Sequence, residues 1–163
     1  LIAIALYILI RFRNISFSIG AVVGLVHDVL FILGIYSIFY SIMPFSLEID
    51  QSFIAAILTV IGYSINDTVV VFDRIRENVG LYPKRALNQL INMSVNSTLS
   101  RTFSTSFSTA LPLLAMFIFG GETIRGFVFA ILLGVIVGTY STIFIASPIA
   151  YDIQEKQAKK AQK

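Results

Sequence analysis

The stretch FIAAILTVIGYSINDTVVVF, residues 53–72, decides the fold because it is almost wholly apolar yet carries one carboxylate, Asp67. A helix that crosses a bilayer needs about 20 predominantly apolar residues, and this stretch supplies them. An ionised carboxylate inside a bilayer costs several kcal/mol, so an intramembrane aspartate indicates an ion or proton path. The stretch therefore predicts a membrane-spanning helix in a transport protein.

The composition extends this prediction to the whole chain. Of the 163 residues, 56% are hydrophobic and 13% are charged, which is too apolar for a soluble core and favours a helical membrane bundle. The net charge of +3 is dispersed, so no nucleic-acid partner is expected. The chain has no cysteine and one histidine, so disulfides and thiolate metal sites are excluded and no metal site or catalytic constellation is predicted.

Three further stretches are apolar and long enough to cross a membrane, namely residues 17–42, 102–119 and 124–149. None of the four stretches alternates apolar and polar residues with a period of two, so helices are expected and a membrane β-barrel is not. The predicted fold class is an all-α, polytopic transmembrane helix bundle. Residues 13–150 form this bundle, and residues 151–163 form a basic tail.

The first residues are also apolar, and they are followed rather than preceded by Arg11 and Arg13. A signal peptide carries its positive charge on the other side of the apolar region. Residues 1–12 are therefore expected to be the end of a truncated span and a cytoplasmic turn, and the chain is expected to be a fragment.

Most lysine and arginine residues fall on one side of the predicted spans. Acidic residues prevail in the two short connections on the other side, which carry Glu48, Asp50 and Glu122 together with Arg125. The positive-inside rule places the connection 73–100 and the C-terminus in the cytoplasm. The cationic residues on this side are Arg11, Arg13, Arg74, Arg76, Lys84, Arg85, Lys156, Lys159, Lys160 and Lys163.

The connection 73–100 is the only long one. Pro83 interrupts it, and apolar residues then recur at helical spacing from Ala86 to Val95. This pattern predicts an amphipathic helix that lies along the membrane surface, with a simple linker helix as the alternative.

The last predicted span carries a ladder of small residues at every fourth position. Such a ladder gives one nearly smooth helix face, against which a neighbouring backbone can approach closely. Gly20 and Gly24 give the first full span a shorter version that continues to Asp28. We interpret the ladder as a packing surface. Its members are Gly126, Ala130, Gly134, Gly138, Thr142, Ala146 and Ala150.

The first full span contains two polar side chains, His27 and Asp28. They come about ten residues into the span, and a helix rises about 1.5 Å per residue, so they are expected near the middle of the membrane. Two interpretations stay open for them. They could form a proton-binding pair, or they could satisfy each other and a neighbouring helix by hydrogen bonding.

A second polar group surrounds Asp67. Asn66 precedes it, and Arg101 opens the next span, where Ser104, Thr105 and Ser108 share one helical face with it. Asp67 and Arg101 flank the same connection and thus lie on antiparallel helices at similar depth. A moving Arg101 would switch the protonation of Asp67, which is a proton gate in principle. The alternative is a static ion pair that holds two helices together.

The segment GYSINDTVVVFDRIREN, residues 62–78, closely resembles the signature of the SecF family of bacterial protein-export membrane proteins. The resemblance extends in the same order to four further blocks, so it covers nearly the whole chain. These blocks are VHDV at 26–29, TLSRT at 98–102, FGGE at 119–122 and GVIVGTYSTIFIASP at 134–148.

This resemblance implies a six-span, SecF-type half of a resistance-nodulation-division membrane unit, of which the chain would hold the second to sixth spans. It implies that Asp67 and Arg101 take part in the ion path, together with an aspartate of the SecD half. It also implies a transport subunit of the bacterial inner membrane rather than an enzyme, with no cofactor except a coupling ion, H⁺ or Na⁺. The implied partners are SecD, SecYEG, indirectly SecA, exported preproteins and membrane lipids.

Two other classes of function stay open. Relatives in the same superfamily export drugs or lipids with the same arrangement of spans, and the residues of a bundle do not name its cargo. The chain could also be a non-conducting scaffold subunit of a membrane complex.

Overall fold

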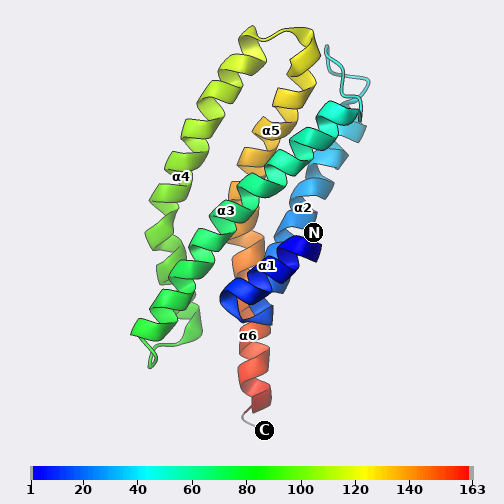
Figure 1. The fold of residues 1–163 in the computed structure, drawn as a ribbon. Helices are drawn as coiled ribbons and strands as arrows, with labels where there is room; N and C mark the ends of the chain where they lie inside the picture. Colours follow the sequence, from blue (N-terminus) through cyan, green and yellow to red (C-terminus); the bar gives the residue numbers. More distant parts are fainter. Residues whose placement is uncertain (1, 162–163) are drawn as a thin grey trace.

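The computed structural model describes residues 2–161, in which all regular secondary structure is helical, and this confirms the predicted all-α class. Four helical segments are long and apolar enough to cross a membrane, which agrees with the predicted number of full spans. Figure 1 shows the arrangement. The elements are α1 (Ile2–Phe12), α2 (Ile15–Phe39), α3 (Gln51–Leu81), α4 (Leu87–Phe119), α5 (Glu122–Ser141), the π-helical segment η1 (Thr142–Ala146) and α6 (Ser147–Ala161).

The helix starts follow from local side-chain chemistry. The Asn14 side chain caps α2 by accepting a hydrogen bond from the Ser16 amide at 2.9 Å, and the Asp50 side chain caps α3 by accepting from the Phe53 amide at 2.9 Å. Arg13, with φ of 50°, makes the tight turn between α1 and α2. These caps satisfy amides that a helix start leaves without partners.

The structure corrects the predicted surface helix between residues 73 and 100. Helix α3 continues past residue 72 to Leu81, and α4 runs without interruption from Leu87 to Phe119. The connection is therefore the short loop 82–86, which contains Pro83. The apolar residues at helical spacing include Leu90 and Ile91, which are buried inside the protein instead of lying on a membrane surface.

The last span is also longer than predicted. Helix α5, η1 and α6 form one continuous rod over Glu122–Lys160, so the predicted basic tail begins as helix. The rod widens at η1, where the Ser147 amide donates to the Thr142 carbonyl five residues earlier. Pro148 follows directly and has no amide hydrogen to continue the regular α-helical bonding.

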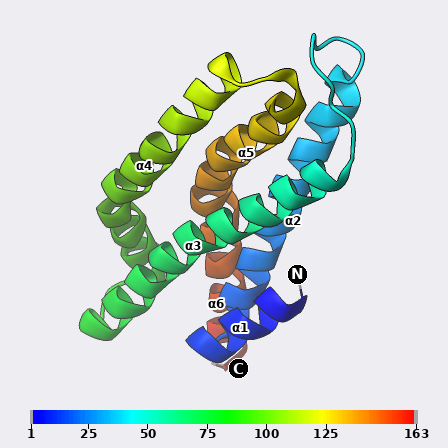
Figure 2. The same ribbon diagram turned by 45° about the horizontal axis from the view of Figure 1, so that its top comes forward.

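Helix α5 lies among α2, α3 and α4, as Figure 2 also shows. Close packing there depends on the small residues of the ladder. A Cβ atom at Gly134 would collide with the Val60 side chain of α3, and one at Gly138 would come within 3.1 Å of the Ser64 side chain. Further along the rod, Ala146 and Ala150 pack against Gly20 of α2.

Two apolar clusters form the core, at different heights of the bundle as it stands in Figure 1. The upper cluster ends at Val60 on α3 and Val135 on α5, whereas the lower cluster begins at Val71 on α3 and Ala146 on η1. Polar side chains occupy the interval between them. Its buried members, which we call the polar layer, are Asp28, Ser64, Asp67, Thr68, Ser106, Thr139, Ser141 and Thr142.

Candidate ion-coupling site

Hydrogen bonds between helices satisfy most of the polar layer. The Ser64 hydroxyl donates to Asp28 Oδ2 at 2.7 Å and so links α3 to α2. The hydroxyls of Thr68 and Thr142 lie 2.9 Å apart and link α3 to η1. Each pair replaces water that a buried hydroxyl would otherwise require, so the layer is stable in an apolar surrounding.

A similar contact joins α4 to α5. The hydroxyls of Ser106 and Thr139 lie 2.6 Å apart, and the Tyr63 hydroxyl donates to the Ser106 hydroxyl at 3.2 Å. The sequence does not predict a role for these hydroxyl groups or for those of Thr68 and Ser141, and it indicates Thr142 only as a small residue of the ladder. A single serine or threonine in an apolar stretch is a weak signal, because its hydroxyl can also bond to its own helix.

Asp67 differs from the other residues of the polar layer because its carboxyl is not satisfied by hydrogen bonds within the described chain. It is 5% exposed, and its Oδ2 atom is buried without a hydrogen-bond partner among residues 2–161. A buried polar atom without a partner is rare in folded proteins and often marks a functional group or a missing ligand. The described chain therefore leaves one oxygen of this carboxyl available to an ion, a proton or a group from another chain.

Arg101 lies near Asp67 but does not pair with it. Its positive charge acts on the Asp67 carboxyl, yet no ion pair between the two is present in the described part of the chain. The Arg101 side chain is exposed on α4. The structure thus places the two predicted partners as neighbours, with the arginine outside the buried layer.

The other predicted pathway residues lie on the surface. Asn66 is exposed on α3, and Ser104, Thr105 and Ser108 are exposed on α4. The Thr105 hydroxyl bonds back to the carbonyl groups of Arg101 and Thr102 at 3.1 and 2.9 Å. Helix α4 therefore presents an open polar stripe beside its buried hydroxyls. The structure brings none of these four residues into the polar layer with Asp67.

His27 and Asp28 are in contact, with 3.2 Å between His27 Nδ1 and Asp28 Oδ1. Asp28 is buried at 1% exposure, whereas the His27 side chain is 32% exposed. Because Asp28 also accepts from Ser64, both of its oxygens have partners. The structure supplies the neighbouring helix that the second interpretation of this pair requires.

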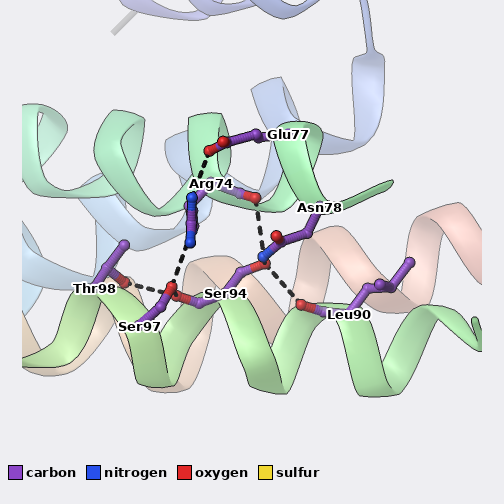
Figure 3. Close-up of polar contacts among 7 residues, drawn as sticks. All are labelled: Arg74, Glu77, Asn78, Leu90, Ser94, Ser97 and Thr98. Carbon is purple, nitrogen blue, oxygen red and sulfur yellow. Dashed lines mark hydrogen bonds and ion pairs between the residues drawn. The ribbon is translucent and has the colours of Figure 1, made fainter. Parts of the chain in front are cut away.

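Below the polar layer, α3 and α4 are held together by a second set of polar contacts, drawn in Figure 3. The Asn78 side-chain amide donates to the Ser94 hydroxyl at 2.7 Å, and the Ser94 hydroxyl donates to the Leu90 carbonyl at 2.7 Å. Arg74 Nε donates to the Ser97 hydroxyl at 3.1 Å. We call Asn78, Ser94, Arg74 and Ser97 the stem clasp, because they join the two helices next to the loop 82–86.

Fold and site together define a multi-pass helical membrane protein built around a buried carboxyl. Comparison with known proteins narrows this class. The family model for protein export membrane protein SecD/SecF, C-terminal, matches residues 1–156. The chain belongs to this SecD/SecF family, which confirms the resemblance seen in the sequence.

Named relatives and solved structures agree with this assignment. Protein translocase subunit SecF of Rhodothermus marinus is 52% identical over 160 residues, which cover 98% of this chain and 52% of that protein. SecF of Cereibacter sphaeroides is 49% identical over 146 residues, which cover 90% of this chain and 43% of that protein. The chain thus spans about half the length of these relatives.

Two crystal structures of SecDF have the same fold. The super-membrane-facing form superposes with a TM-score of 0.86 at 40% identity, covering 98% of this chain and 21% of that one. SecDF of Thermus thermophilus, described as a translocon-associated membrane protein, gives a TM-score of 0.82 at 42% identity, covering 93% and 20%.

Proposed function

We propose that the chain is the membrane part of a SecF-type subunit that uses an ion gradient to promote protein export across the bacterial inner membrane. Asp67 takes up and releases the coupling ion, H⁺ or Na⁺. Arg101 sets the affinity of Asp67 for that ion by approaching or withdrawing. No cofactor besides the ion is needed. The observation that supports this role most is the buried Oδ2 of Asp67, which has no partner in the described chain.

The open polar stripe supports a partner at this site. Its residues Arg101, Ser104, Thr105 and Ser108 on α4 are exposed, as is Asn66 on α3, and both helices are long and apolar enough to cross a membrane. Exposing an arginine to lipid is costly, so a second membrane protein or a water-filled path must cover this surface. SecD, or a SecD half of the same protein, is the partner that we propose. Water held between the two surfaces would connect Asp67 with the aqueous phases.

Membership of the family and the distribution of charges support a proposal for the remaining partners and the orientation. We propose that the subunit acts with SecYEG on preproteins that SecA has pushed into the channel, with the loop 82–86 and the C-terminus in the cytoplasm. A single charge that crosses a potential of 100 mV releases roughly 2.3 kcal/mol, which suffices to shift a two-state arrangement of helices.

Export with and without an ion gradient, measured in full-length protein with SecD present, tests the proposal. Asp67→Asn preserves the size of the side chain but removes its titration, so gradient-dependent export should be lost while insertion and assembly persist. Arg101→Ala should act in the same way. Asp73→Asn is the matched control, because Asp73 lies on the same helix but pairs with Arg11 at the surface. Normal gradient-dependent export by Asp67→Asn would refute the carrier role.

A further inference from the structure

Two of the four residues of the stem clasp, Asn78 and Ser94, are buried to a degree that a simple helix connection does not require. Asn78 is 2% exposed and Ser94 is fully buried, and the Ser94 hydroxyl also lies 3.3 Å from the Arg74 carbonyl of the opposite helix. Figure 3 shows the Asn78 and Ser94 side chains pointing toward each other from α3 and α4. Separating them would leave the buried Asn78 amide without its partner, whereas the Ser94 hydroxyl would keep its bond to the Leu90 carbonyl of its own helix. A buried amide without a partner is strongly unfavourable.

The clasp also fixes the relative heights of the two residues of the proposed gate. Asp67 lies three turns from Asn78, about 16 Å along α3, and Arg101 lies two turns from Ser94, about 10 Å along α4. Because the two helices are antiparallel, the Arg101 backbone stands about 6 Å nearer to the loop 82–86 than the Asp67 backbone. The long, flexible arginine side chain can cover this offset in one conformation and turn away in another.

Sliding of the helices is the other way to bring the two groups together. A slide of one helical turn moves an element by about 5.4 Å, which would close most of the offset. Such a slide would also break the Asn78–Ser94 and Arg74–Ser97 contacts. The clasp therefore opposes sliding but leaves the Arg101 side chain, which is exposed, free to change its rotamer.

We propose that Asn78 and Ser94 are positioning residues for the gate. They hold α3 and the adjoining part of α4 as one rigid hairpin, so that Arg101 gates Asp67 by moving its side chain and not by sliding its helix. This inference rests on the proposed function of Asp67 and Arg101. Arg101 is the charged group that acts on Asp67 in the described chain. Tyr63 lies one turn away on the same helix, Asp28 of α2 bonds to Ser64 three residues from Asp67, and α5 and η1 contribute only hydroxyls to the polar layer.

A reversible cross-link tests the proposal directly, because residues 1–163 contain no cysteine and any cysteine elsewhere in the full-length protein or in its partner can be replaced by serine. Asn78→Cys and Ser94→Cys are combined in the full-length protein with its SecD partner. The rate of gradient-dependent export is then measured as a function of pH, first with free thiols and again after the two thiols have been bridged. A disulfide or the shortest bis-methanethiosulfonate reagent makes the bridge. The reduced form lacks the hydrogen bond, so its pH midpoint should shift by about 0.5 unit, as expected for a charge displaced by about 2 Å near the carboxyl. The bridged form should recover the original midpoint.

Loss of export on bridging, with recovery on reduction, would overturn the proposal, because it would show that the two helices must slide. An unchanged midpoint in the reduced form would overturn it as well. Single variants provide a second measurement that needs no bridge. Ser94→Ala should shift the midpoint, Ser94→Thr should preserve it by retaining the hydroxyl, and Ser100→Ala, at an exposed position of the same helix, should have no effect.

The proposed function can fail separately from this inference. If Asp67→Asn exports normally, the carrier role is refuted whatever the cross-link does. If Asp67→Asn loses gradient-dependent export while the bridged protein is blocked, only the rigid hairpin is refuted.

Discussion

Asp28 and Asp67 are both buried aspartates of the same polar layer, but they differ in the hydrogen-bond partners that the described residues give them. Asp28 has a partner for each oxygen, Ser64 from the next helix and His27 from its own. Asp67 is buried to a similar degree, but no hydrogen bond reaches either of its oxygens from the described residues, and its Oδ2 atom is fully buried. Burial alone therefore does not distinguish the carboxyl that we propose as the ion site from one whose oxygens are bonded within the protein. The partners of each oxygen do.

The largest effect on stability is expected at Asp28. Asp28→Ala removes the acceptor of two hydrogen-bonding groups and leaves Ser64 buried without its partner, so it should cost about 2–4 kcal/mol of unfolding free energy. Asp67→Ala should cost less than about 1 kcal/mol, because its Oδ2 has no hydrogen bond to lose. Reversible unfolding in detergent compares the two. Equal costs would show that the difference in partners has no energetic meaning.

Gly134→Val tests the close packing of α5 against α3, the helix that carries Asp67. A side chain at this position collides with Val60, so overpacking between α3 and α5 should cost about 1–3 kcal/mol. Combining it with Val60→Ala should restore part of the loss. Gly62→Val is the control, because a Cβ there meets no atom within 4 Å. Similar unfolding free energies for Gly134→Val and Gly62→Val would contradict the close contact of the ladder.

Thr68→Val removes the hydroxyl contact between α3 and η1 while retaining the shape of the side chain. Hydrogen bonds between membrane helices contribute about 0.6 kcal/mol on average, and a loss of this size is expected. A double-mutant cycle with Thr142→Val isolates the pair. Additive effects of the two changes would show that the contact contributes nothing to the layer.

The smallest effect is expected at the surface. Arg11→Gln breaks the 3.0 Å ion pair with Asp73, in which both side chains are roughly two-fifths exposed. Exposed pairs of this kind contribute about 0.2–1 kcal/mol, and salt screens them. The effect should therefore shrink as salt is added. A cost that stays constant up to high salt would indicate packing of Arg11 rather than charge.

The spans and the presence of an aspartate within one of them could be predicted from the sequence because each depends on local chemistry. An apolar run of sufficient length and a lone charge within it are visible without a structure. The exposure of Ser104 and Ser108 was not visible, because the spacing on a helix shows which residues share a face but not which neighbour covers it. The extension of α4 back to Leu87 was missed for a similar reason. Polar residues such as Asn78 and Ser94 indicate a solvated connection until tertiary contacts bury them.

Ion flux tests the difference between the two aspartates most directly. The full-length protein with its SecD partner is reconstituted in proteoliposomes, and gradient-driven uptake of H⁺ and of Na⁺ is measured for Asp67→Asn and Asp28→Asn. Asparagine at position 28 can still accept from Ser64, so flux should persist there, whereas Asp67→Asn should abolish it. Flux that survives Asp67→Asn, or disappears only with Asp28→Asn, would contradict the assignment of the ion site to Asp67.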